Sequence, residues 1–115
     1  MLSDQAIERR MHELREISKR YAKAKAEQTY IEEFRKSKLA ILMKKHQDKH
    51  ASNAAQETEA RRDPEYLVLL DALKVAVEEA EALRWELEIA RMGVDVWRTN
   101  QANVRSEKKA WNLNG

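Results

Sequence analysis

A heptad repeat of apolar residues runs through the second half of the chain. Between residues 66 and 104, alternating steps of three and four residues meet an apolar or aromatic side chain at eleven of twelve positions, and only Gln101 interrupts the series. The series comprises Tyr66, Leu69, Leu73, Ala76, Ala80, Leu83, Leu87, Ala90, Val94, Trp97, Gln101 and Val104. Such a repeat lets one helix lie along another over many turns. We call it the first seam, and it predicts a long helix with a helical partner.

A second apolar series lies on another face of the same predicted helix. Its members repeat with the same spacing and are Ala82, Trp85, Ile89, Met92 and Val96. A helix in a two-helix hairpin needs one apolar stripe, so two stripes indicate burial from two sides. One seam is expected to pack within the hairpin and the other between subunits, and the pattern leaves open which does which. The residues predicted for an oligomer interface are Trp85, Ile89, Met92 and Val96.

The first half of the chain predicts another long helix, from about residue 4 to residue 50. Ser3 or Asp4 can cap its start, and apolar residues follow, mostly three or four apart. Residues 51–63 form a connector, in which Ser52 or Asn53 can cap a short helix.

The sharpest local signal follows the connector. Asp63, Pro64 and Glu65 supply an N-cap, a proline at the first helical position and an acid in the first turn. They predict that the last helix starts at Pro64 and runs to about residue 110. Gly93 lies inside this helix, where we expect a close helix crossing or a kink rather than a break.

Composition supports an all-α fold. The 115 residues include two glycines and one proline, too few for the turns of a compact sheet protein. We therefore expect a single domain, residues 1–115, built as a long antiparallel helical hairpin of coiled-coil type with a short connecting helix. A hairpin of this length buries only a thin core, so we expect it to assemble into a helical oligomer.

Charge is uneven along the chain although the net charge is only +2. Four arginines lie seven residues apart, Arg84, Arg91, Arg98 and Arg105, and Lys108, Lys109 and Trp111 follow them. Guanidinium groups bind phosphates bidentately, and an exposed indole can stack on an unpaired base, so this column is a candidate track for single-stranded nucleic acid. The alternative is structural, because charges that flank a seam commonly pair with acids on a neighbouring helix. A second basic cluster on the first helix includes Lys36 and Lys38.

Catalytic and metal-binding patterns are missing. The chain has no cysteine, and no phosphate-binding glycine loop, nucleophile elbow or zinc-protease motif occurs. His46 and His50 lie four residues apart, but no suitably placed acid completes a metal site. We therefore expect no enzyme activity, no cofactor and no metal. No run of 18 apolar residues and no signal-peptide pattern occurs, so we expect a soluble protein without a membrane partner.

Three segments resemble small helical proteins of tailed bacteriophages: residues 21–38, 64–67 and 96–105. The layout, a basic helix, a connector and a second helix ending in Trp, Arg and Lys, is similar to UvsY-type recombination mediators. The resemblance implies ring assembly, binding of single-stranded DNA, and loading of a recombinase in place of the single-strand-binding protein. It assigns DNA contact to Arg98, Arg105, Lys108 and Lys109 and, on the first helix, to Lys36 and Lys38.

Two functional hypotheses follow. The first is a non-enzymatic oligomer that binds single-stranded DNA in phage recombination or replication, in the cytoplasm of a bacterial host cell. Its partners would be further copies of the chain, single-stranded DNA, and a recombinase or single-strand-binding protein. Its DNA contacts would be Arg91, Arg98, Arg105, Lys108, Lys109, Trp111, Lys36 and Lys38. The second hypothesis is a coiled-coil adaptor or assembly protein that binds other proteins and not nucleic acid.

Overall fold

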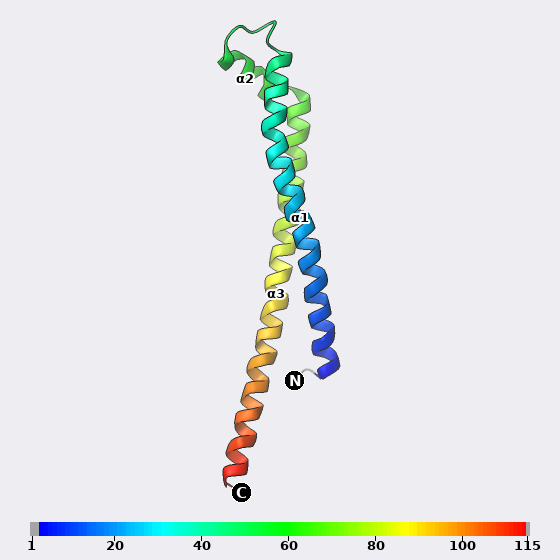
Figure 1. Cartoon of the computed structure of the whole chain (residues 1–115), viewed down its shortest axis with the longest axis vertical. Helices are drawn as coiled ribbons and strands as arrows, with labels where there is room; N and C mark the ends of the chain where they lie inside the picture. Colours follow the sequence, from blue (N-terminus) through cyan, green and yellow to red (C-terminus); the bar gives the residue numbers. More distant parts are fainter. Residues whose placement is uncertain (1–2, 115) are drawn as a thin grey trace. The chain divides into compact units, whose positions relative to one another are not determined.

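Three helices make up the protein (Figure 1). The computed structural model describes residues 3–114, with helix α1 at Asp4–Lys45, α2 at Asn53–Arg62 and α3 at Pro64–Asn114. No strand occurs within this described range. The prediction of an all-α fold is therefore confirmed, and so is the prediction of a helical hairpin with a short connecting helix.

Polar side chains cap the start of each helix, as the sequence predicts. Ser3 Oγ accepts a hydrogen bond from the backbone N–H of Ala6 at 3.1 Å, and Ser52 Oγ accepts one from Ala55 at 3.1 Å. Asp63 Oδ1 accepts one from the N–H of Glu65 at 2.9 Å. Each bond satisfies a backbone donor that has no partner within its own helix, so the side chains fix where the helices begin.

The helix ends differ from the prediction by a few residues. The first helix ends at Lys45 rather than near residue 50, because the chain enters turns over residues 46–49. There the N–H of His46 is shared between the carbonyls of Leu42 and Met43, at 3.1 and 3.2 Å. The last helix continues to Asn114, beyond the expected residue 110, since no proline or glycine interrupts it in that stretch.

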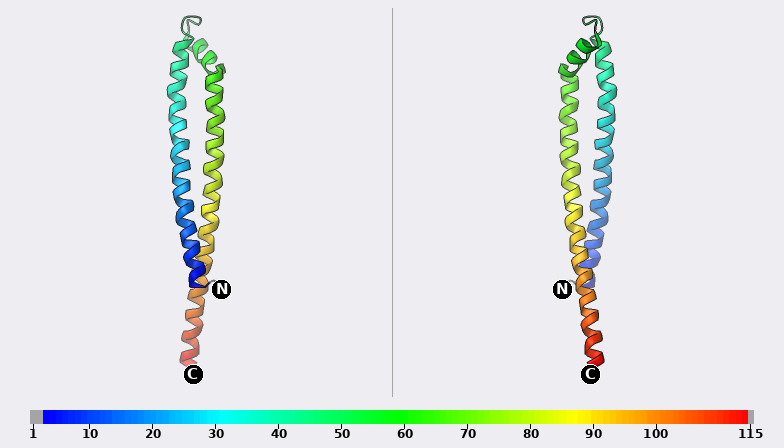
Figure 2. Two further views of the ribbon diagram at one scale, coloured as in Figure 1. Left: turned by 90° about the vertical axis from the view of Figure 1, so that its right-hand side faces the viewer. Right: turned by 90° about the vertical axis from the view of Figure 1, so that its left-hand side faces the viewer.

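The chain divides into two compact units. Ala22–Ala82 form one, which we call the corner unit, and Met1–Tyr21 with Leu83–Gly115 form the other, which we call the terminal unit. In the corner unit, α2 connects the end of α1 to the start of α3, and these two helices run antiparallel (Figure 2). They also run antiparallel in the terminal unit, where Arg20 lies 4.0 Å from Glu86 and Arg10 approaches Gly93.

The first seam faces the partner helix within each unit. None of its twelve residues is exposed, and its most buried members are Tyr66, Ala76 and Ala80 in the corner unit and Leu83, Leu87 and Val94 in the terminal unit. The second seam is exposed at every position. The structure thus assigns the first seam to packing within the chain and leaves the second uncovered.

All three helices meet in one small apolar cluster of the corner unit. Leu42 of α1, Ala60 of α2 and Tyr66 of α3 are buried there, and Leu39, Met43 and Leu70 pack against them. Leu42 is the one large side chain with less than 2% exposure among the described residues. This cluster holds α2 against the two long helices.

Gly93 neither breaks α3 nor has a positive φ. A Cβ atom added at this position would lie 3.1 Å from Arg10 Nη1, the far end of a flexible side chain, and would meet no backbone of α1 within 4 Å. We therefore expect Gly93→Ala to raise the free energy of unfolding by about 0.5–1 kcal/mol, because alanine loses less backbone entropy in a helix. Urea unfolding followed by circular dichroism measures this change. A lower stability would show that close packing at Gly93 matters.

Candidate interaction surfaces

An apolar surface on α3 is open to solvent in the terminal unit. We call it the outer stripe, and it consists of Trp85, Ile89, Met92 and Val96. Each of these side chains is between 59% and 66% exposed. Exposed large apolar side chains are common singly, and a contiguous row of four on one helix face is a candidate interaction surface. These are the four residues predicted for an oligomer interface, and the structure leaves their side chains accessible.

Charged side chains line one edge of the outer stripe. The Arg84 guanidinium lies over the Trp85 ring, 4.8 Å from its centroid, a cation–π geometry. Arg91 Nη1 lies 3.4 Å from Glu88 Oε1, one turn further along α3. Arg91 is exposed and Glu88 is partly exposed, so this ion pair contributes little to stability by itself.

The end of α3 carries the most accessible basic residues. In the terminal unit, α3 continues past the start of α1 (Figures 1 and 2), and every residue from 105 to 112 is exposed. We call residues 105–112 the C-terminal segment. It contains three bases, Arg105, Lys108 and Lys109, and one acid, Glu107. Trp111 is 79% exposed. None of these three bases forms an ion pair within the described part of the chain.

Most of the other predicted DNA contacts are engaged with acids, and Arg98 lies apart from the C-terminal segment. Arg91 pairs with Glu88, as described above, whereas Arg98 is exposed. Lys36 and Lys38 belong to the corner unit, where Lys36 Nζ lies 3.1 Å from Glu33 Oε1 and Lys38 Nζ lies 3.6 Å from Glu65 Oε1. The structure therefore brings together only Arg105, Lys108, Lys109 and Trp111, and the side chain of Lys38 is largely covered.

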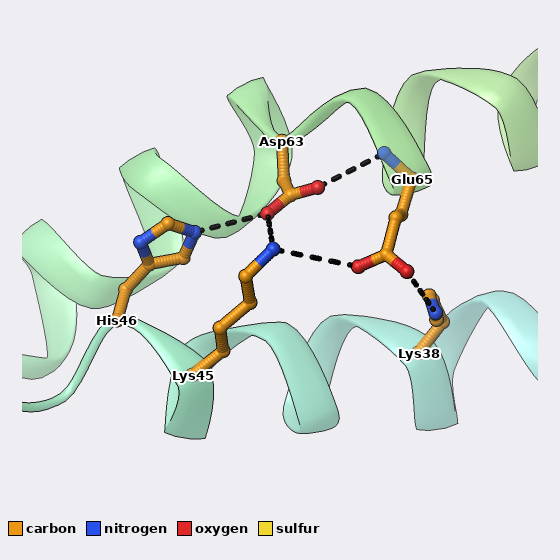
Figure 3. Close-up of polar contacts among 5 residues, drawn as sticks. All are labelled: Lys38, Lys45, His46, Asp63 and Glu65. Carbon is orange, nitrogen blue, oxygen red and sulfur yellow. Dashed lines mark hydrogen bonds and ion pairs between the residues drawn. The ribbon is translucent and has the colours of Figure 1, made fainter.

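A polar cluster at the α2–α3 junction was only partly expected from the sequence (Figure 3). The Asp63 carboxylate is 3% exposed and accepts hydrogen bonds from Lys45 Nζ at 2.9 Å and from the backbone N–H of Glu65, while His46 Nε2 lies 3.1 Å away. Lys45 and Lys38 also reach Glu65, at 3.5 and 3.6 Å. The Lys45 hydrogen bond, with the Glu65 N–H, lowers the pKa of Asp63 from 3.8 to about 2. The same contact raises the pKa of Lys45.

This cluster ties the end of α1 to the start of α3. Asp63 was predicted as an N-cap, but its contacts with Lys45 and His46 span 18 and 17 residues and depend on the turns that close the corner. Each acid in it is matched by a base or a backbone N–H. We assign it a structural role.

A shallow groove lies between α1 and α3 in the terminal unit. It has a volume of about 530 Å³ and is lined by Ile7, Glu8, Met11, Arg15, Val94, Trp97 and Arg98. Trp97 Nε1 is buried and has no hydrogen-bond partner among the described residues. Indole N–H groups in protein interiors normally find an acceptor, so this one is an exception in the packing of α1 against α3.

Within residues 3–114, no three His, Cys, Asp or Glu side chains gather in a way that could hold a metal ion. No helix in that same range is long and apolar enough to cross a lipid bilayer. No protein-family model, no curated protein and no solved structure matches this chain.

Proposed function

We propose that the protein is a non-enzymatic helical protein that binds single-stranded DNA through its C-terminal segment. The observation that carries this proposal is the exposure of Arg105, Lys108, Lys109 and Trp111 together on the unpacked end of α3. Three cations on about two turns of helix can neutralise neighbouring phosphates, and Trp111 offers a ring on which a base can stack. The resemblance to UvsY-type mediators suggests phage recombination as the setting, with a recombinase or single-strand-binding protein as a protein partner.

Binding should depend on where the positive charge lies and not only on its amount. We expect the native protein to bind a fluorescently labelled single-stranded oligonucleotide at low salt, and Lys108→Glu/Lys109→Glu to weaken this binding at least about tenfold. If each lysine contacts one phosphate, the slope of log affinity against log salt falls by about 0.7 per lysine. Fluorescence anisotropy across a salt series measures both quantities.

A matched control separates position from net charge. Lys23 and Lys25 are exposed on α1 in the corner unit, and Lys23→Glu/Lys25→Glu changes the net charge by the same amount. We expect this control to bind within about twofold of the native protein if contacts are local. Equal losses in the two variants would show that only overall charge matters. No binding by the native protein at low salt would reject the proposal.

A second candidate function is a protein-binding coiled-coil adaptor or assembly protein. The outer stripe favours it, because a row of exposed apolar side chains is suited to receive another helix. This candidate predicts that substitutions in the outer stripe alter association with other proteins. It also predicts that the native protein does not bind the oligonucleotide at any salt concentration. The anisotropy series above therefore distinguishes the two functions.

A further inference from the structure

The spacing of the first seam continues into the C-terminal segment. After Val104, steps of four and three residues reach Lys108 and Trp111, which are exposed because α3 has passed the start of α1. The face of α3 that packs against α1 in the terminal unit is therefore the face on which these two residues lie. A strand that follows this face in the direction of α1 meets the groove between the two helices.

Two arginines line this groove, Arg98 from α3 and Arg15 from α1. Both are exposed, and neither forms an ion pair within the described part of the chain. Arg98 lies seven residues before Arg105, so the two side chains start from nearly the same side of α3, with their Cα atoms about 10 Å apart along its axis. Guanidinium groups without an acidic partner can bind phosphates bidentately, so the groove continues the basic residues of the C-terminal segment.

The remaining lining of the groove is mostly apolar. Ile7 and Met11 line it from α1, and Val94 and Trp97 line it from α3. Basic groups beside apolar and aromatic surface suit single-stranded nucleic acid, since phosphates and bases alternate along a strand. The lining contains two bases and one acid, Glu8, so its charge also favours an anionic occupant.

From the continuous face, the unpaired arginines and the apolar lining, we infer that the binding path for single-stranded DNA extends from the C-terminal segment into the groove between α1 and α3. This inference rests on the proposed function and adds a second contact region to it. Arg98 and Arg15 bind phosphates in the groove, and a base lies against Met11 and Trp97. Helix α1 thereby contributes to a site that the C-terminal segment would otherwise confine to α3.

Neutralising the arginine of α1 tests the path. We expect Arg15→Gln to weaken binding of the labelled oligonucleotide at least about fourfold and to lower the slope of log affinity against log salt by about 0.7, the loss of one phosphate contact. Arg9→Gln is the matched control, because Arg9 is exposed on the same helix and does not line the groove. This control should keep the native slope. If the native protein binds and the two variants behave alike, the groove is not part of the path and the inference is wrong.

The acid of the groove provides a test of opposite sign. Glu8→Gln removes a repulsive charge from the path, so we expect it to raise the affinity for the oligonucleotide about threefold in 0.1 M salt, where charges more than about 10 Å away are largely screened. Glu13→Gln changes the net charge equally, but Glu13 is exposed on α1 outside the groove lining, so its affinity should stay near the native value. Equal gains in the two variants would show that net charge determines the effect and would contradict the inference.

Tryptophan fluorescence reports whether a base enters the groove. The chain has three tryptophans, and Trp85→Phe/Trp111→Phe leaves Trp97 as the only one, with a phenylalanine still able to stack at position 111. We expect the unlabelled oligonucleotide to quench Trp97 fluorescence at concentrations where anisotropy shows this variant to be bound. An unchanged Trp97 signal in the bound variant would confine the strand to the C-terminal segment and overturn the inference alone. A native protein that binds no oligonucleotide at low salt would reject the proposed function as well, so the two failures are distinguishable.

Discussion

Replacing Leu42 by alanine is expected to lower the free energy of unfolding by about 2–5 kcal/mol. Leu42 is 1% exposed and lies in the cluster where α1, α2 and α3 meet, against Ala60 and Tyr66. Truncation removes apolar contacts and leaves a cavity that short neighbours such as Ala60 cannot fill. Domains of this size are stable by only about 5–15 kcal/mol, so one such cavity removes a large share of the total.

Urea unfolding at a fixed protein concentration measures this loss, because self-association adds to apparent stability. Ile41→Ala is the matched control, since Ile41 precedes Leu42 on the same helix but is 57% exposed. We expect that control to change stability by no more than about 0.5 kcal/mol. Equal losses at positions 41 and 42 would contradict the packing described for the corner unit.

Replacing Asp63 is expected to lower the midpoint of thermal unfolding and to remove part of its pH dependence. Asp63→Ala deletes the cap of α3 and leaves Lys45 and His46 without their shared acceptor. Asp63→Asn retains capping ability and removes the charge, so its loss should be smaller. The ordering Asp63→Ala below Asp63→Asn below native separates the two contributions, and it is read from melting curves at neutral pH.

Acid weakens the same contact in a defined window. The folded-state pKa of Asp63 is about 2, below its ordinary value of 3.8. The charged carboxylate therefore contributes its full stabilisation at pH values above 3.8. This stabilisation is lost as the pH falls from about 3.8 through about 2. The difference in melting temperature between the native protein and Asp63→Asn should therefore shrink over this range. A difference that stays constant down to pH 2 would show that the carboxylate is not stabilised by its neighbours.

The helices and their caps could be predicted from local sequence, because the determinants lie within a few residues of each other. Ser52, Asp63 and Pro64 act on backbone groups one to three residues away. The end of the first helix could not be predicted in this way. It is set at His46 by the turns of the corner and by Asp63, which is 17 residues distant.

The sequence also could not decide which apolar seam faces inward. Leu83 and Leu87 share their spacing with Trp85 and Ile89, so periodicity alone treats both series alike. The structure separates them, because α1 covers only one face of α3. For the candidate DNA site, the column of basic residues was recognisable from sequence. The ion pairs of Arg91 with Glu88 and of Lys38 with Glu65 could be identified only from the structure.

The bare end of α3 has an energetic consequence. A helix of eight residues without a packing partner is marginal in water, since each added turn gains little beyond the cost of fixing its backbone. Amide hydrogens of residues 105–112 should therefore exchange with solvent far sooner than those of the paired stretches. A ligand that binds this segment as a helix must supply the free energy that orders it. The affinity for such a ligand therefore depends on the cost of folding the segment as well as on the contacts formed.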